Sequence, residues 1–399
     1  MNSADGEKFW DGILAAYGEI ALKSDRVRGR FVSKLKSNIR EAFAARGLDV
    51  RVRHRWSRIL VDGLDDIDLG CRVASRIFGL KYIAPYRYVG LNDLESFMRD
   101  NASKLLDGVE SFAVRVRRTG MHSFTSRDLE RSVGGIVKEV SGIRVDLDNP
   151  DRTIYVEVHD SECYVYTDRV EAPGGLPLGA SSRVVSLVSG GIDSPVATWL
   201  MMKRGCPVTM LFAYFPFGGD ESDLRRFLAV ARILRDWHIG EEIRVYSYRH
   251  DNALKEIRRL ADGYTCVLCR RMMYRVACRV AEMEGAKAIV TGENLAQVAS
   301  QTLDNLYVVD EASTLPVLRP LIGFEKEDSV RMARMIGTYE ASTMPVSSGC
   351  RPIKGCWARP RKPTTRAIFD RVRELESMID VDRLVGEALS SLRDLSNLL

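Results

Sequence analysis

Hydrophobic and polar positions in the first part of the chain follow the periods of both helices and strands. Large apolar residues recur at every fourth position between residues 31 and 43, which predicts an amphipathic helix. Between residues 50 and 55, valines alternate with basic residues, which predicts a half-buried strand with a basic outer face. The elements of residues 1–85 follow a β-α-β-β-α-β order, which is typical of a ferredoxin-like α+β domain. Its other predicted elements are strands at 13–17, 59–61 and 81–86 and a helix at 67–78.

A second α+β unit is expected over residues 86–172. Residues 154–166 alternate like a β-hairpin, with Asp160 and Ser161 at its turn. Residues 173–180 are rich in glycine and proline, so they are expected to link this unit to the rest of the chain. The other predicted elements of the unit are helices at 94–106 and 126–140 and a strand at 112–117.

From residue 181 to residue 399, short apolar runs alternate with helical segments. Such alternation predicts an α/β domain built on a doubly wound parallel sheet. Ligands of such sheets bind beyond the carboxyl ends of the strands. The chemistry of this domain is therefore expected in the loops that follow its strands. The predicted strands are residues 184–188, 208–212, 243–248 and 288–290.

The sequence Ser-Gly-Gly-Ile-Asp-Ser, residues 189–194, directly follows the first of these strands. Glycine lets backbone N–H groups approach an anion closely, and the helix expected around Pro195 directs its positive end to the same point. No lysine closes the loop, so it is not the Walker sequence of kinases and GTPases. The motif predicts a phosphate-binding loop, and the alternative is a glycine-rich turn that binds nothing.

Charge is spread unevenly, although the net charge of the chain is only +5. Residues 21–58 hold 12 Lys and Arg against 3 Asp and Glu, a local excess of +9 that leaves −4 for the rest. Such asymmetry indicates a polyanionic partner, with a solvated basic surface as the alternative. A second cluster without acids contains Arg351, Lys354, Arg359, Arg361, Lys362 and Arg366.

No apolar run is long enough to span a bilayer, and the first residues lack the apolar core of a secretion signal. The chain has eight cysteines. This usage is typical of a reducing compartment, so a cytoplasmic protein is expected. The cysteines are then packing residues, metal ligands or reactive sulfur rather than a disulfide framework.

Six short motifs stand in order along the chain: YGEIALK at 17–23, RRTG at 117–120, FTSRDLE at 124–130, SGGIDS at 189–194, RMM at 271–273 and TGEN at 291–294. Together they resemble the tRNA 4-thiouridine synthetases, the ThiI family of tRNA sulfurtransferases. That family places a ferredoxin-like domain first, a THUMP RNA-binding domain second and a PP-loop ATP pyrophosphatase domain last. The resemblance implies these domains at residues 1–85, 86–172 and 181–399.

The resemblance implies that the last domain binds ATP. Asp193 is expected to orient Mg²⁺ or the loop, because a carboxylate beside phosphates needs a cation. Arg270 or Arg271 is expected to neutralise phosphate or tRNA charge. Taken alone, Gly292 would mark only a strand end and Gln301 only the cap of a turn. The implied ATP-binding residues are Leu187, Val188, Ser189, Gly190, Gly191, Asp193, Ser194, Phe212, Ala213, Arg270, Gly292 and Gln301.

The resemblance also implies the reaction. ATP would adenylate O4 of uridine 8 in tRNA, and sulfide or a persulfide carrier would then attack C4 and expel AMP. The family also implies a homodimer, and it leaves open whether the chain serves thiamine biosynthesis. Alternatives are 2-thiouridine-type thiolation, or an RNA-binding protein whose nucleotide domain is inactive. Contacts to tRNA are expected from the basic face of the first domain and from Arg115, Arg117, Arg118 and Arg127.

Cys266 and Cys269 have the C-x₂-C spacing that lets two thiolates bind one metal ion or cluster. Spacing alone leaves an iron–sulfur cluster, zinc and a redox dithiol open. These cysteines resemble those of the archaeal-type members of the family, which have no rhodanese domain. They imply a 4Fe–4S cluster held by Cys266, Cys269 and Cys350 that presents the sulfur. These cysteines and Asp193 are the expected catalytic residues, Cys356 is expected outside the cluster, and the histidines form no ligand pattern.

Overall fold

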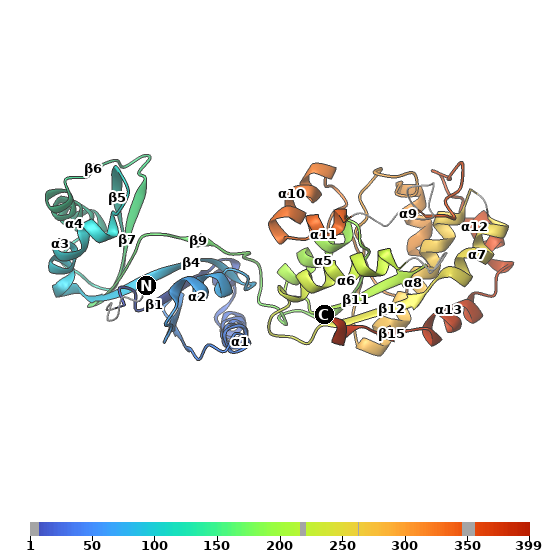
Figure 1. The fold of residues 1–399 in the computed structure, drawn as a ribbon, viewed down its shortest axis with the longest axis horizontal. Helices are drawn as coiled ribbons and strands as arrows, with labels where there is room; N and C mark the ends of the chain where they lie inside the picture. The colour runs from blue at the N-terminus through green and yellow to red at the C-terminus, as the bar shows by residue number, and fades with distance from the viewer. Residues whose placement is uncertain (1–7, 216–220, 262, 345–355) are drawn as a thin grey trace. The chain divides into compact units, whose positions relative to one another are not determined.

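The computed structural model describes residues 8–215, 221–261, 263–344 and 356–399 (Figure 1). The contacts divide the chain into two compact units, Met1–Gly175 and Leu176–Leu399. Among the described residues, no helix is both long and apolar enough to cross a membrane.

One nine-stranded sheet runs through the described part of the first unit. Its strands are β1 (Gly12–Tyr17), β2 (Arg51–Arg55), β3 (Arg58–Asp62), β4 (Leu80–Gly90), β5 (Ser111–Thr119), β6 (Arg144–Val145), β7 (Arg152–His159), β8 (Glu162–Tyr166) and β9 (Val170–Glu171). The order is β2-β3-β1-β4-β8-β7-β5-β6, and β9 pairs with β4. The first part of β4 pairs with β1, and residues 87–90 pair with β8. The strand expected at 81–86 is therefore longer, and the boundary expected between residues 85 and 86 falls inside it.

Helices cover this sheet where the hydrophobic period predicts them. α1 (Asp25–Ala44) buries the apolar stripe of residues 31–43. α2 (Ile67–Ala74) is shorter than the helix expected at 67–78, because the chain turns toward β4 at Ser75. Ile77 and Phe78 stay buried without being helical. The other helices are η1 (Glu19–Leu22), η2 (Leu91–Asp93), α3 (Leu94–Leu105) and α4 (Ser126–Ser141), which starts with a capping box of Thr125 and Asp128.

A buried ion pair joins the two halves of this sheet. Arg58 Nη2 lies 2.8 Å from Glu157 Oε1, and the side chains are only 8% and 3% exposed. The Tyr166 hydroxyl donates to the same carboxylate oxygen at 2.8 Å. Trp56, at the turn between β2 and β3, stacks on the His159 ring with centroids 3.7 Å apart. The β2–β3 hairpin is therefore held against β7 by both charge and aromatic packing.

Glu157→Gln is expected to destabilise the first unit by about 3–5 kcal/mol, because it leaves the buried Arg58 charge without a counter-ion. Burial opposes ionisation of Glu157, but hydrogen bonds from His159 and Arg58 and the Arg58 charge outweigh it and lower its pKa from 4.5 to about 2. Because the folded-state pKa is the lower one, the pair stabilises the fold above about pH 4.5 and loses this contribution as the pH falls toward 2. Urea unfolding of the full chain at several pH values measures both effects. The exposed Glu171→Gln is the control, and equal unfolding midpoints for the two variants would contradict the prediction.

The second unit contains a six-stranded sheet in its described part. Its strands are β10 (Val184–Leu187), β11 (Val208–Tyr214), β12 (Arg244–Arg249), β13 (Ile289–Val290), β14 (Val317–Leu318) and β15 (Arg393–Asp394). The order is β14-β13-β10-β11-β12-β15. The first five strands of this order are parallel, as expected, whereas β15 pairs antiparallel with β12 because the final segment returns along that free edge. The strand order reverses between β10 and β13, which is where such sheets bind ligands.

Some helices of the second unit pack on this sheet and others pack on those helices (Figure 1). α8 (Thr265–Glu284) buries Val276, Ala277, Val280 and Ala281 in the core. It begins at Thr265, one residue before Cys266, so the C-x₂-C pair lies on a helix. The others are α5 (Asp193–Lys203), α6 (Ser222–Arg235), α7 (Asp251–Leu260), α9 (Leu303–Asp310), α10 (Lys326–Ile336), α11 (Tyr339–Thr343), α12 (Phe369–Ser377), α13 (Val381–Ser390) and η3 (Ser396–Leu398).

Candidate functional site

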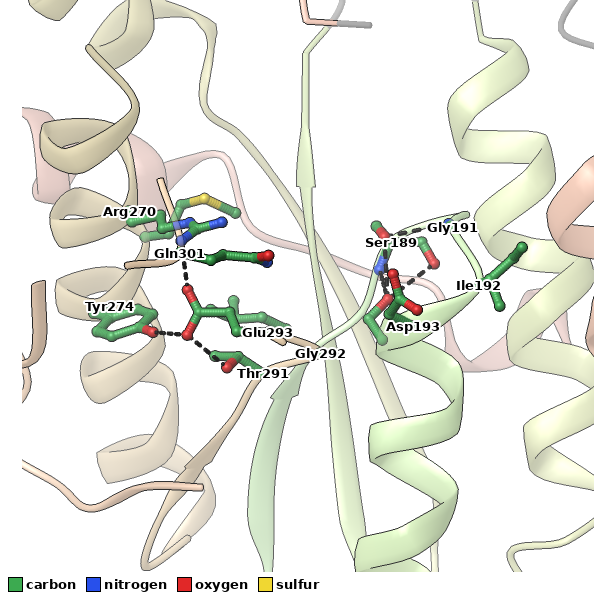
Figure 2. Close-up of a pocket in the computed structure, with 13 residues that line it drawn as sticks. Ser189, Gly191, Ile192, Asp193, Arg270, Tyr274, Thr291, Gly292, Glu293 and Gln301 are labelled. Carbon is green, nitrogen blue, oxygen red and sulfur yellow. Dashed lines mark hydrogen bonds and ion pairs between the residues drawn. The ribbon is translucent and has the colours of Figure 1, made fainter. Parts of the chain in front are cut away.

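A cavity of about 250 Å³ opens where the strand order of the second unit reverses (Figure 2). Its walls come from the loop after β10, from α8 and from the segment after β13. Because the two loops follow adjacent parallel strands, their backbone and side chains converge on one space. The lining residues are Leu187, Ser189, Gly191, Ile192, Asp193, Ser194, Arg270, Met273, Tyr274, Thr291, Gly292, Glu293 and Gln301.

The loop after β10 is held in shape by its own serines. Ser194 Oγ accepts a hydrogen bond from the Ser189 amide at 2.8 Å, and the two hydroxyl oxygens lie 3.0 Å apart. The Gly191 amide donates to Ser189 Oγ at 3.2 Å. From α11, the Ser342 hydroxyl donates to the Gly191 carbonyl at 3.2 Å. The loop is thus held by its own hydrogen bonds, and the hydroxyls of Ser189 and Ser194, two of the implied ATP-binding residues, are engaged within it.

Two glycines in this region are required by close contacts. A Cβ atom on Gly292 would lie 2.5 Å from the amide nitrogen of Ser194, so only glycine lets the loop after β13 touch the start of α5. A Cβ atom on Gly190 would lie 2.6 Å from Arg226 Cδ on α6. Gly292 therefore does more than end a strand, because it brings the two halves of the cavity together.

Asp193 is held by two partners that are distant in the sequence. Lys326 Nζ lies 2.8 Å from both carboxylate oxygens, and the Gln297 amide donates to Oδ2 at 3.2 Å. The Asp193 side chain is 21% exposed and lines the cavity. A carboxylate in this position is a suitable ligand for a divalent cation that also binds phosphate. Nothing in the local sequence around Lys326 marks it as a site residue.

The opposite wall carries a buried carboxylate network. Glu293 Oε1 lies 2.8 Å from Arg270 Nη1, and its other oxygen accepts a hydrogen bond from Tyr274 at 2.9 Å (Figure 2). Arg319, from the loop after β14, donates to the same oxygen at 2.7 Å. Burial opposes ionisation, but the charges of Arg270 and Arg319 outweigh it and hold the pKa of Glu293 below its ordinary value. Glu293 therefore stays ionised and fixes Arg270 at the cavity wall.

Arg270 and Arg271 have different roles, which sequence reasoning left open. Arg271 is 1% exposed, and its guanidinium pairs with Glu376 at 2.7 Å and Glu311 at 2.6 Å. It ties α8 to α12 and does not line the cavity. Arg270 is the member of the pair that faces the site.

The structure brings most of the predicted nucleotide residues together. Gln301 is 8% exposed, and its Oε1 atom has no hydrogen-bond partner in the described part of the chain. A buried amide oxygen at a cavity wall is suited to accept a bond from a ligand N–H group. The predicted residues outside the lining of the cavity are Val188, Gly190, Phe212 and Ala213, and the lining residues not predicted are Ile192, Met273, Tyr274, Thr291 and Glu293.

Cys269 of the C-x₂-C pair directly precedes Arg270, which lines this cavity. Cys266 and Cys269 are three residues apart on α8 and so share one helix face. Cys356, expected outside this site, lies near enough that its charge raises the pKa of both thiols, after the larger effect of burial. Cys350 lies outside the described residues. Among the residues described, no three His, Cys, Asp or Glu side chains are placed to hold a metal ion.

Sequence reasoning missed a histidine beside these thiols. His250 Nε2 lies 3.4 Å from Cys269 Sγ, and the ring is fully buried between Phe215 and Tyr248. Burial lowers the pKa of His250 to about 4, so the ring is neutral. The contact joins the end of β12 to α8, and no spacing in the sequence connects them.

A second cavity, of about 500 Å³, lies in the first unit and is lined by basic and aromatic side chains. Arg169 stacks over Tyr155, with its guanidinium carbon 3.6 Å from the ring centroid. Of the arginines expected to bind RNA, Arg115 and Arg117 line this cavity. Arg118 instead binds the loop that follows β5, and Arg127 is exposed in the first turn of α4. The other lining residues are Arg58, Tyr82, Val116, Val156, Glu157 and Tyr166.

Three family models match consecutive parts of the chain. The ThiI ferredoxin-like domain matches residues 12–84, the THUMP domain matches residues 91–168, and the thiamine biosynthesis protein (ThiI) model matches residues 179–381.

Curated proteins are similar over nearly the whole length. The "Probable tRNA sulfurtransferase" of Methanothermobacter thermautotrophicus is 39% identical over 95% of this chain and 96% of its own. The "tRNA sulfurtransferase" of Desulfurococcus amylolyticus is 35% identical over 94% of this chain and 77% of its own.

Solved structures share the fold. A crystal structure of a 4-thiouridine synthetase–RNA complex with bound ATP matches with a TM-score of 0.85 and 30% identity, over 96% of this chain and 99% of that one. PH1313 from Pyrococcus horikoshii matches with a TM-score of 0.63 and 23% identity, over 82% of this chain and 99% of that one, which supports the fold alone.

Proposed function

This chain belongs to the ThiI family of tRNA sulfurtransferases, and on that basis we propose that it uses ATP to convert uridine 8 of tRNA to 4-thiouridine. One observation carries the proposal. The SGGIDS loop and the segment of residues 291–293 line one cavity at the carboxyl end of the parallel sheet, and Cys269 Sγ lies 3.4 Å from Nε2 of His250, which directly follows β12 at the same end. Nucleotide activation and sulfur delivery would thus share one site.

ATP is the proposed nucleotide. The amides of the loop and the positive end of α5 would hold the β- and γ-phosphates. Gln301 Oε1, buried and without a partner among the described residues, would accept a bond from the adenine amino group. The solved relative at 30% identity, which holds ATP together with RNA, supports this choice.

Adenylation requires control of charge at the phosphates. O4 of the uracil would attack the α-phosphorus, the bond to the bridging oxygen would break, and its electron pair would leave with pyrophosphate. Asp193 fits as the protein ligand of Mg²⁺, since its carboxylate faces the cavity and this cation prefers oxygen ligands. When bound, Mg²⁺ would neutralise phosphate charge. Lys326, held now by Asp193, would provide a second positive group at the same place.

The thiols suit a cluster bound by thiolates. Cys266 and Cys269 share a helix face, and Cys356 acts electrostatically on both. We propose that the pair and Cys350, as the resemblance implies, would hold an iron–sulfur cluster with an open iron, with Cys356 as the alternative third ligand. When bound, the cluster would present sulfur from sulfide or a persulfide carrier. His250, against Cys269, would orient that ligand.

The first unit is the proposed tRNA-binding part. The cavity around Arg115, Arg117 and Arg169 offers phosphate contacts beside the faces of Tyr82 and Tyr155. Cationic groups next to aromatic faces suit unpaired nucleotides, whose bases stack while their phosphates are neutralised. The cavity is therefore proposed to hold single-stranded nucleotides of the tRNA.

A fragment of residues 1–175 is expected to bind tRNA without the second unit. Its affinity should fall about tenfold or more between 50 and 200 mM salt, because each neutralised phosphate releases a counterion. Filter binding at several salt concentrations measures this slope, with circular dichroism to establish that the fragment is folded. A folded fragment without affinity at low salt would show that the basic surface is only solvated.

The test of the proposed function is a reconstituted reaction. The full chain, purified without oxygen, is incubated with unmodified tRNA, ATP, Mg²⁺ and sulfide. We expect 4-thiouridine at position 8, with AMP and pyrophosphate formed in step. Sulfur at C2 of another uridine would support the 2-thiouridine alternative, and tRNA binding without AMP would support an inactive nucleotide domain.

Two further proposals concern the working form of the enzyme. A homodimer is proposed, to be tested by light scattering with and without tRNA. Because the proposed substrate is tRNA and the thiols must remain reduced, the cytoplasm is the proposed compartment.

A further inference from the structure

The phosphate loop has no cation of its own, since residues 189–194 contain no lysine or arginine. Two cations that line or adjoin the cavity are already engaged. Lys326 pairs with Asp193 at 2.8 Å, and Arg270 pairs with Glu293 at 2.8 Å. A triphosphate bound here would therefore need positive charge from another element.

Arg226 on α6 reaches the loop. A Cβ atom on Gly190 would lie 2.6 Å from Arg226 Cδ and 2.8 Å from its Cγ, so the stem of this side chain crosses directly over Gly190. The next residue, Phe227, is fully buried and stacks on Phe212 at 4.5 Å, which fixes this turn of α6 against the end of β11. The position of the stem is thus set by packing.

The guanidinium of Arg226 is available for a ligand. The residue is half-buried, and in the ranges that the structure describes it has no hydrogen bond or ion pair. By contrast, Arg270, Arg271 and Arg319 of this unit all have carboxylate partners. A half-buried guanidinium that has no counter-ion and lies beside the proposed phosphate loop is suited to pair with an anion when one binds there.

We propose that Arg226 contacts the β- and γ-phosphates of ATP and the pyrophosphate that they become. This inference rests on the proposed use of ATP at this site. When the bond between the α-phosphorus and the bridging oxygen breaks, its electron pair remains on the pyrophosphate. A guanidinium, which donates two parallel hydrogen bonds to phosphate oxygens, would stabilise that charge as it develops. Arg226 would thus supply the charge that the loop lacks.

The test compares ligands that differ in these phosphates. Binding of ATP, pyrophosphate and AMP to the full chain is measured by calorimetry in the presence of Mg²⁺. Arg226→Met keeps the length of the stem over Gly190 and removes the charge. We expect this variant to bind ATP and pyrophosphate about tenfold or more weakly than the wild type. Its affinity for AMP should fall less than about twofold. Arg226→Lys should recover part of the loss, and Arg225→Met, an exposed neighbour on α6, is the control.

The outcomes separate this inference from the function on which it rests. If the wild-type chain binds neither ATP nor pyrophosphate, the proposed function fails. The inference is wrong if the wild-type chain binds ATP but Arg226→Met lowers the affinities for ATP and AMP equally, or lowers neither. In either case Arg226 has no specific role at the outer phosphates. The inference would also be overturned if Arg225→Met lost as much affinity for ATP and pyrophosphate as Arg226→Met.

Discussion

Asp193→Asn is expected to stop tRNA-dependent pyrophosphate release, with a loss of the order of 10²–10³ in kcat. Asparagine preserves the size of the side chain and its bond to Gln297, but it removes the charge that holds Lys326 and would hold Mg²⁺. Binding of tRNA should not change, because the proposed RNA contacts lie in the first unit. Pyrophosphate release, AMP and 4-thiouridine are measured together on one tRNA.

Asp304→Asn is the matched control for this substitution. Asp304, like Asp193, lies in the first turn of a helix, but it is exposed on α9. Both variants lose the same favourable interaction with a helix N-terminus, which is worth about 0.3–1 kcal/mol. Thiolation by Asp193→Asn at the wild-type rate would remove this carboxylate from the chemistry.

Cys266→Ser and Cys269→Ser are each expected to lose bound iron and at least about 99% of 4-thiouridine formation. The physical reason is that a serine oxygen is a poor substitute for thiolate toward iron and sulfur. ATP binding and tRNA-dependent pyrophosphate release should persist, because the SGGIDS loop is untouched. Iron content and visible absorbance are measured after purification without oxygen. Cys278→Ser, buried on the same helix beside Ser313, is the control and should keep both.

The third ligand is decided by a pair of variants. We expect Cys350→Ser to lose iron and thiolation while Cys356→Ser keeps them, and the reverse result would assign Cys356. Loss in both variants would indicate four protein ligands and no open iron. Active wild-type protein that contains zinc without iron would refute the cluster.

The sequence predicts those parts of the fold that depend on local periodicity. The stripe from Phe31 to Phe43 identifies α1, and the short apolar runs after residue 181 predict the parallel sheet. The end of α2 could not be predicted from the sequence. Ile77 and Phe78 continue its helical period because they are buried in the core, although they are not helical. The same holds for β15, whose direction depends on which sheet edge is free.

The residues of the candidate site likewise divide into those that a local motif predicts and those that only the tertiary fold brings there. Ser189, Asp193 and Gly292 belong to short motifs, and all of them line the cavity. Lys326 and His250 lie in segments without a motif and reach the site only through the tertiary fold. Arg226 is one of many arginines in the sequence, and only its stem over Gly190 distinguishes it. Side chains that approach from another element leave no local signal.

The strand β4 limits how this chain can be recombined. Because residues 80–86 pair with β1 and residues 87–90 pair with β8, a cut at residue 85 or 86 would divide one strand between two pieces. Each piece would expose a broken sheet edge, which is prone to aggregate. The ferredoxin-like and THUMP parts would thus be inherited and exchanged as a single module. A chimera that transfers the RNA specificity of a relative should therefore join the chains near Gly175.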